Sequence, residues 1–129
     1  MGKHSASLAC PCGSGLSLDA CCGRWHAGEA APSAEALMRS RYSAYVLGLE
    51  DYLLATWHPD TRPAALHLAD EAPMKWLGLK VLVAKASGDT ATVHFVARYK
   101  IRGRAAFIDE NSRFVRERGC WFYVDGLLS

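Results

Sequence analysis

The chain has five cysteines, and four of them lie close together near its N-terminus: Cys10, Cys12, Cys21 and Cys22, in the arrangement C-x-C-x8-C-C. Thiols clustered in this way predict a tetrahedral zinc site, because structural zinc is held by four thiolate or imidazole ligands. A full set of four protein ligands leaves no position for a water, so we expect the zinc to be structural rather than catalytic. Disulfides and a redox pair are less favoured alternatives, because residues 1–9 hold no apolar secretion segment and there is no C-x-x-C.

The segment around these cysteines is too short to bury a hydrophobic core of its own, so we expect the metal to order it. Residues 13–15, Gly-Ser-Gly, favour a tight turn between the cysteine pairs. Four thiolates around Zn²⁺ leave negative charge at the site, and we expect Arg24 and His26 to offset part of it. We expect Trp25 to pack the segment onto the rest of the chain.

Helical periodicity begins after this segment. Ser33 stands at a capping position, and apolar residues then recur at three- and four-residue spacing. The pattern predicts a helix over 34–47 with Gly48 near its end. A short helix is expected over 50–57 and a third over 63–71.

From Trp76 the apolar period changes to two, which predicts β-strands. Turn signals at 87–89, 102–104 and 117–119 divide the region into four strands, the last ending near Val124. Short turns containing glycine join strands into an antiparallel meander. Helices followed by a meander predict an α+β fold, with the helices packed on one face of the sheet.

Two parts of the chain resemble known families. Residues 10–15, Cys-Pro-Cys-Gly-Ser-Gly, followed by Cys21-Cys22-Gly23, resemble the SEC-C zinc motif. That motif also occurs in the tail of the SecA translocase ATPase, where the last ligand is usually histidine rather than the cysteine present here. The rest of the chain is similar to the bacterial YchJ family, through the segments 37–45, 55–60, 110–114 and 121–126.

The YchJ resemblance implies a main domain with the fold of nuclear transport factor 2 (NTF2), a curved antiparallel sheet that wraps a long helix to form a cone. The expected division is a zinc knuckle and linker over 1–30 and an NTF2-like α+β domain over 31–129. The resemblance to the translocase tail implies that the knuckle binds a partner protein. No activity is implied for the main domain.

Cones of this fold often hold a small-molecule pocket, which is an analogy at the level of the fold. The candidate pocket residues are Tyr42, Tyr45, Trp57, His58, Glu110, Arg113 and Trp121. A histidine beside a carboxylate could perform acid–base chemistry. Polar groups on solvated strand faces look the same, so an enzyme is less favoured and no catalytic residue is assigned. We expect a half-buried ion pair at Arg113, and we expect Arg39 and Arg41 to keep their charged heads in water.

Basic residues outnumber acidic ones in the second hairpin. Arg98, Lys100, Arg102 and Arg104 alternate along the sequence, so a regular strand would place all four on one face. Such a row could follow the phosphates of RNA or an acidic protein surface. An ordinary solvated hairpin is the favoured alternative.

The whole chain has a net charge of only +2, and its apolar runs are too short to cross a bilayer. We therefore expect a soluble cytoplasmic protein without membrane insertion. The favoured function is an adaptor whose zinc knuckle mediates protein–protein interaction. The alternatives are a small-molecule or enzymatic pocket in the cone, and RNA or ribosome binding through residues 98–104. By analogy with the fold, the sheet face could also form a homodimer.

Overall fold

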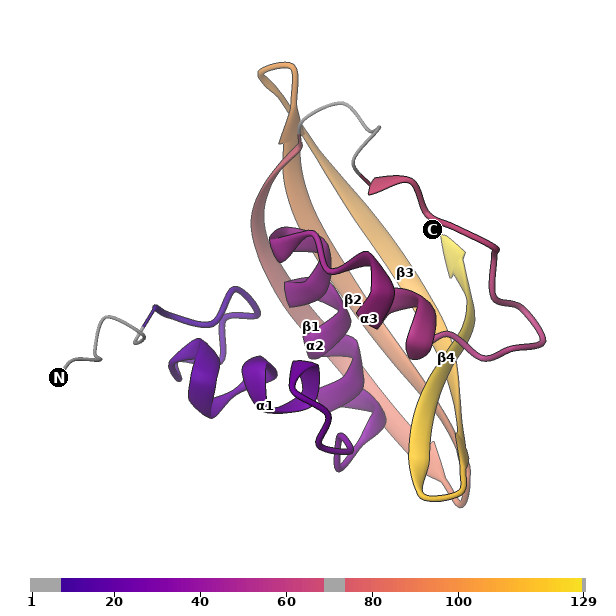
Figure 1. The fold of residues 1–129 in the computed structure, drawn as a ribbon. Coiled ribbons are helices and arrows are strands. Elements are labelled where there is room, and N and C mark those ends of the chain that lie inside the picture. The colour runs from indigo at the N-terminus through magenta and orange to yellow at the C-terminus, as the bar shows by residue number, and fades with distance from the viewer. Residues whose placement is uncertain (1–7, 69–73, 129) are drawn as a thin grey trace, which may run out of the picture.

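The computed structural model describes residues 8–68 and 74–128. Four strands form an antiparallel sheet in the order β1-β2-β3-β4 (Figure 1). The strands are β1 Met74–Ser87, β2 Thr90–Ile101, β3 Arg104–Glu117 and β4 Cys120–Leu128. The predicted meander is confirmed, and β4 continues beyond the predicted end at Val124.

Three α-helices precede the sheet: α1 Cys22–His26, α2 Ala34–Leu47 and α3 Glu50–Ala55, with a short 3-10 turn, η2 Leu18–Ala20, before them. The prediction for α2 is confirmed at both ends. The Ser33 hydroxyl accepts a hydrogen bond from the Ala36 N–H at 3.0 Å, and Gly48 ends the helix in the left-handed region at a φ of 74°.

The third predicted helix is wrong over 63–67, which are not helical, and residues 69–71 lie outside the described part of the chain. The backbone N–H groups of Leu66 and Leu68 donate instead to the Glu50 carboxylate, at 3.1 and 2.9 Å. Because these donors bind a side chain of α3, they are not used in helical hydrogen bonds.

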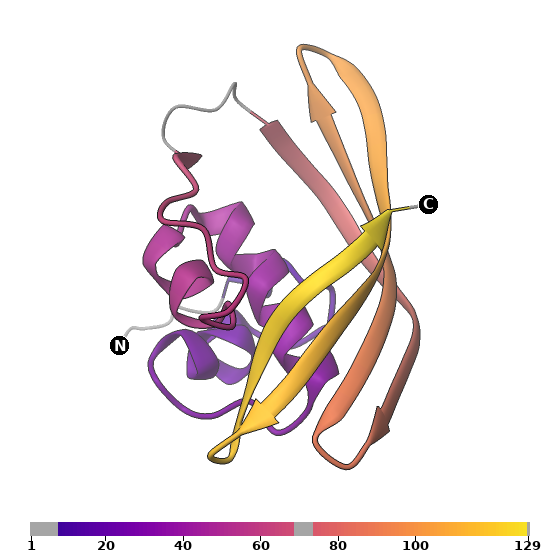
Figure 2. The ribbon, with the colours of Figure 1, turned by 90° about the vertical axis from the view of Figure 1, so that its right-hand side faces the viewer.

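The helices cover one face of the curved sheet (Figure 2). On β2, buried and more exposed positions alternate, so that Val93, Phe95 and Ala97 face the helices. They pack against Leu37 and Met38 of α2 in the same core cluster. Register shifts within β1 and between Arg113 and Phe114 of β3 mark bulges, which bend strands. The expected α+β arrangement, with an NTF2-like sheet and helices on one face, is confirmed.

The N-terminal segment packs beside α2 (Figure 1). Three of its cysteines, Cys10, Cys12 and Cys22, belong to the same core cluster as Leu37 of α2. Trp25 packs against this cluster while partly exposed, as expected. The core is therefore continuous across the expected division between residues 30 and 31, and that division stays a prediction. None of the described helices is long and apolar enough to span a membrane.

Candidate metal centre

The structure brings the four predicted cysteine thiols together. Their Sγ atoms all lie within 4.8 Å of one another. Cys12 and Cys21 are separated by 3.7 Å between sulfurs, and Cys21 and Cys22 by 4.0 Å. A tetrahedral zinc with Zn–S bonds of about 2.3 Å would hold its sulfurs about 3.8 Å apart. The donor set and its spacing therefore fit a zinc-like ion, and the cluster could hold a metal.

Two short pieces of backbone position the thiols. The strand-like segment at Cys10 folds back on itself, with the Cys10 N–H donating to the Leu16 carbonyl at 2.9 Å. Gly13 and Gly15 make this reversal possible, because both have a positive φ, 82° and 88°. The second pair of thiols comes from the start of α1, directly after η2.

The site is closed on the side that faces α2. Cys12 and Cys22 are fully buried and Cys10 is nearly so, whereas Cys21 keeps partial exposure. Ser43 of α2 lies beside Cys10, with its Oγ 3.5 Å from the sulfur. Such a closed site with four cysteine ligands is typical of structural metals.

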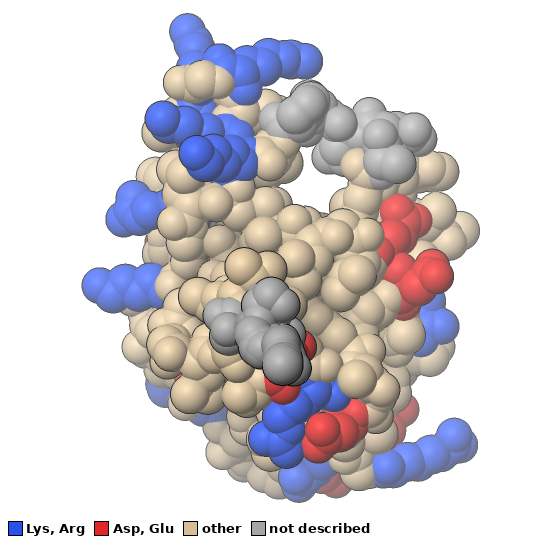
Figure 3. Space-filling view, turned by 60° about the vertical axis from the view of Figure 1, so that its left-hand side comes forward, with Lys and Arg blue, Asp and Glu red and all other residues tan. Residues whose placement is uncertain are grey.

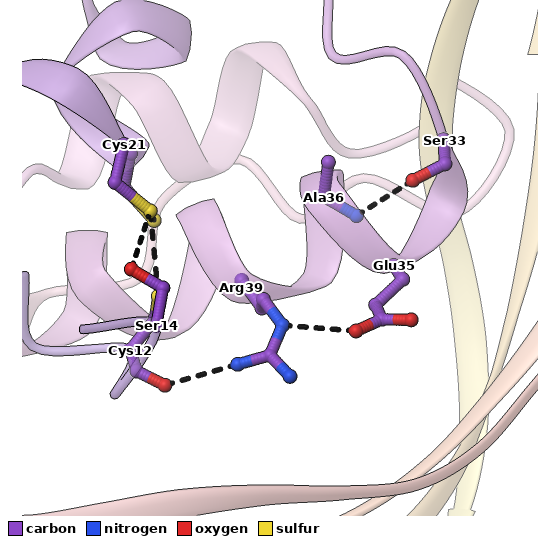
Figure 4. Close-up of polar contacts among 8 residues, drawn as sticks. Cys12, Ser14, Cys21, Ser33, Glu35, Ala36 and Arg39 are labelled. Atoms are coloured by element: carbon purple, nitrogen blue, oxygen red, sulfur yellow. Dashed lines mark hydrogen bonds and ion pairs between the residues drawn. The ribbon is translucent and has the colours of Figure 1, made fainter. Parts of the chain in front are cut away.

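A cation that contacts the cysteine segment is not one of those expected from the sequence. Arg39 of α2 donates from Nη1 to the Cys12 carbonyl at 3.1 Å and from Nε to Glu35 at 3.0 Å (Figure 4). Ser14 supplies a further donor, its hydroxyl to the Cys21 sulfur at 3.1 Å. These contacts can offset negative charge on the thiolates.

Arg24 and His26 have other partners. Arg24 forms an exposed ion pair with Glu29 at 3.1 Å, and His26 Nε2 lies 2.8 Å from the Ser40 carbonyl of α2. The expectation that both offset the cluster charge is therefore not supported. Sequence proximity suggested them, but the helix that docks on the knuckle supplies the cation.

Without a metal, the cluster resists carrying more than one thiolate. A hydrogen bond from Cys22 lowers the pKa of Cys12. The same interaction, together with burial, raises the pKa of Cys22, and burial raises the pKa of Cys21. A divalent cation would remove this conflict by neutralising the thiolates, so metal binding releases protons.

The candidate pocket residues divide into two groups. A cavity of about 580 Å³ lies between α2 and the inner face of the sheet, and it is lined in part by Tyr42, Tyr45, Trp57 and Glu110. These four predicted residues come together.

The other three candidates, His58, Arg113 and Trp121, lie outside the lining of this cavity. Arg113 pairs with Asp125 through two contacts of 2.6 Å, so the expected ion pair is present, but it is exposed on the outer face rather than half-buried. His58 Nε2 lies 3.0 Å from a Glu117 oxygen. Arg113 alternates with the buried residues Ser112 and Phe114 along β3, so its side chain points to the outer face. His58 lies in the connection between α3 and β1 rather than on a strand.

Arg41 is buried, whereas we expected its charged head to lie in water. Its side chain is buried, with Nη1 donating to the Leu53 carbonyl at 2.8 Å and to the Thr56 hydroxyl at 2.7 Å. It lies four residues after Leu37 and three after Met38, so its helical spacing placed it on the buried stripe. The spacing therefore indicated that Arg41 is buried, but the charge of its side chain led to the opposite expectation.

The basic residues of the second hairpin do not share one face. Arg98 and Lys100 are exposed on the outer face of β2, and Arg102 lies in the turn at a φ of 53°. Arg104 pairs across the hairpin with Ile101, so the two side chains lie on the same face of the sheet. That face is opposite to the one that carries Arg98 and Lys100. The alternation predicted for a regular strand is broken by the turn at 102–103. A space-filling view shows Lys and Arg side chains projecting along one side of the molecule (Figure 3).

Two family descriptions match the chain. The description "YchJ, middle NTF2-like domain" matches residues 33–126, and the SEC-C motif matches residues 8–24, which include all four clustered cysteines. A UPF0225 protein from Chromobacterium violaceum is 56% identical over 133 residues, covering 98% of each chain. A UPF0225 protein from Xanthomonas campestris pv. campestris is 58% identical over 127 residues, covering 97% of this chain and 98% of the relative.

Two solved structures have the same fold. The solution structure of a SEC-C motif containing protein from Rhodopseudomonas palustris has a TM-score of 0.84 and 38% identity, covering 93% of this chain and 98% of that chain. The crystal structure of a SEC-C motif containing protein from Psychrobacter arcticus has a TM-score of 0.78 and 29% identity, covering 98% of this chain and 86% of that chain. Both likenesses agree with the resemblances seen in the sequence.

Proposed function

The chain belongs to the family of the YchJ middle NTF2-like domain and carries an N-terminal SEC-C motif, and from this premise we propose that it is a zinc-dependent adaptor. In this proposal a structural zinc shapes the knuckle, defined here as residues 8–26, and the outer surface of the knuckle binds another protein. The observation that carries the zinc is the cluster of four thiols within 4.8 Å of one another.

The identity of the metal follows from ligand chemistry. Four thiolates in a tetrahedron suit Zn²⁺, whereas Mg²⁺ and Ca²⁺ prefer oxygen ligands. Three of the thiols are buried against α2. The metal would therefore hold the knuckle in shape and also fix the surface by which it docks on the main domain.

The surface proposed for the partner is formed by exposed leucines of the knuckle. Leu8 and Leu16 are exposed by 71% and 53%. They belong to adjoining stretches of the knuckle, which the hydrogen bond from the Leu18 N–H to the Leu8 carbonyl holds together at 2.8 Å. Large apolar side chains gathered in the open are a feature of protein-binding surfaces.

The test of zinc is native mass spectrometry of untagged protein before and after chelation. We expect one zinc per chain, lost on chelation. The variant C21S replaces the partly exposed ligand and so disturbs the core least, and we expect it to lose zinc while the sheet stays folded. Protein isolated with no metal, or with another metal that zinc does not displace, would contradict the assignment.

The test of the adaptor is capture of partners by the zinc-loaded protein. We expect the double variant L8S/L16S to keep its zinc and its fold but to lose the proteins that the native chain retains. The control L82S changes a leucine that is 44% exposed on β1 rather than in the knuckle, and should retain them. Retention of the same proteins by L8S/L16S would contradict the proposal.

RNA is a second candidate partner, favoured by one feature of the outer sheet face. Lys75 of β1 lies directly opposite Lys100 of β2, and Arg98 lies on the same face. Binding of a single-stranded RNA oligonucleotide should then weaken steeply with salt and fall in K75E/K100E. Absence of binding at low salt would remove this candidate.

A further inference from the structure

The cavity between α2 and the sheet is separate from the cysteine cluster. It has a volume of about 580 Å³, within the range that small-molecule sites occupy, and no cysteine is among its lining residues in the described part of the chain. Most of its wall is apolar: Met38, Val46, Trp76, Phe95, Ala97 and Ile108. Such a wall suits an aromatic or branched aliphatic body.

One polar feature of the wall is a carboxylate held in a fixed position. The Ser112 hydroxyl donates to Glu110 Oε2 at 2.6 Å, and the Tyr123 hydroxyl donates to the same oxygen at 3.1 Å. Gly126 of β4 leaves room for this carboxylate, because a Cβ at that position would overlap it. Both of these hydrogen bonds use Oε2, so within the described part of the chain Oε1 can accept a further donor.

The second polar feature is the guanidinium of Arg41, which is 3% exposed. Its central carbon lies 4.5 Å from the ring centre of Tyr123 and 5.2 Å from that of Trp57. Among the described lining residues, Arg41 and Glu110 carry the formal charges, one of each sign. No described carboxylate lies within ion-pair distance of Arg41. Arg41 and Glu110 therefore both line the cavity without forming a salt bridge with each other.

We propose that this cavity binds a small uncharged molecule, which has an apolar ring or branched body and one hydroxyl-like end that donates to Glu110. A hydroxyl is suitable because it donates a hydrogen bond without carrying a charge. Arg41 and Glu110 have opposite signs, so a charged end of either sign would be attracted by one and repelled by the other, and it would also lose hydration in a largely apolar site. The site is independent of the proposed adaptor function.

The experiment compares three compounds with the same naphthyl body and different ends: 2-naphthaleneethanol, 2-naphthylacetate and 2-(2-naphthyl)ethylamine. Each is titrated by calorimetry into the zinc-loaded full chain at pH 7. We expect the alcohol to bind at one site, at least tenfold more tightly than either charged compound. Equal or tighter binding of a charged compound, or no binding of the alcohol up to millimolar concentration, would overturn the proposal.

Two variants locate the binding in the cavity. A97L adds bulk to the inner face of β2 and should weaken the alcohol at least tenfold, whereas V96L adds bulk on the outer face of the same strand and should leave it unchanged. E110Q leaves the Arg41 charge unbalanced, so it should strengthen binding of the acetate at least tenfold. Circular dichroism verifies that each variant is folded. Binding that is insensitive to both A97L and E110Q would place the compound elsewhere and refute the site.

Discussion

The knuckle and the sheet domain are held together in different ways, although they share one core. In the sheet domain, which comprises the sheet and the helices α2 and α3 within residues 33–126, the most buried large side chains are apolar, such as Phe114, Leu53 and Val93. In the knuckle the most buried side chains are Cys12 and Cys22. A short segment without an apolar core can be ordered by ligand bonds, and a longer one by burial of hydrophobic surface.

Helix α2 is the element that both regions use. Toward the knuckle it presents Arg39 and Ser43, which contact the cysteine segment. Toward the sheet it presents Arg41 and Tyr42, which line the cavity. One helix can contact two different regions, because successive residues turn by about 100° around its axis and so point to different sides.

The largest effect should come from loss of the proposed metal. C22S removes a fully buried thiol of the cluster, and structural zinc in small motifs contributes apparent free energies of about 10–16 kcal/mol. We expect hydrogen exchange to lose protection over residues 8–32 while β2 and β3 keep theirs. Loss of protection throughout the sheet would show that the two regions unfold as one unit.

The next effect should come from the core of the sheet domain. F114A removes a side chain that is 1% exposed, and such changes cost about 3–5 kcal/mol of unfolding free energy. Chemical denaturation followed by tryptophan fluorescence measures the loss. Native mass spectrometry should still find the metal, and a variant that lost its zinc as well would show that the sheet supports the knuckle.

A smaller effect should come from the contact between the regions. R39A removes the donor to the Cys12 carbonyl, and a hydrogen bond from a charged group contributes about 1.5–3 kcal/mol, less when the group is partly exposed as here. We expect a several-fold loss of zinc affinity in a chelator competition. R24A, which removes an exposed cation of the knuckle, is the control and should leave affinity unchanged.

The smallest effect should come from the outer face of the sheet. The Arg113 guanidinium lowers the pKa of the Asp125 carboxyl below its usual value. Because the pKa is lowered in the folded state, the stabilisation is present above about pH 4 and is lost as the pH falls through the lowered pKa. Melting temperatures of the native chain and D125N should differ slightly at pH 7 and converge at lower pH. A gap that widened in acid would contradict this sign.

Local features of this protein can be predicted from its sequence alone. The spacing of Cys10, Cys12, Cys21 and Cys22 indicated the cluster, and Ser33 and Gly48 marked the ends of α2. The change of apolar period at Trp76 indicated the meander. These signals are local, since ligand spacing, capping and alternation are set by residues close together in the chain. The SEC-C and YchJ resemblances gave the fold family.

Which charged groups point inward depends on how the distant parts of the chain pack together. Arg39 reaches a carbonyl 27 residues away and Arg41 is buried between two rings, while Arg113 lies outside. Glu110 lines the cavity, where Ser112 and Tyr123 donate hydrogen bonds to its carboxylate and Gly126 leaves space for it. These placements depend on packing between distant elements and on strand bulges. The energy of a buried charge is set by such partners, and their proximity follows from the folded chain rather than from its local pattern.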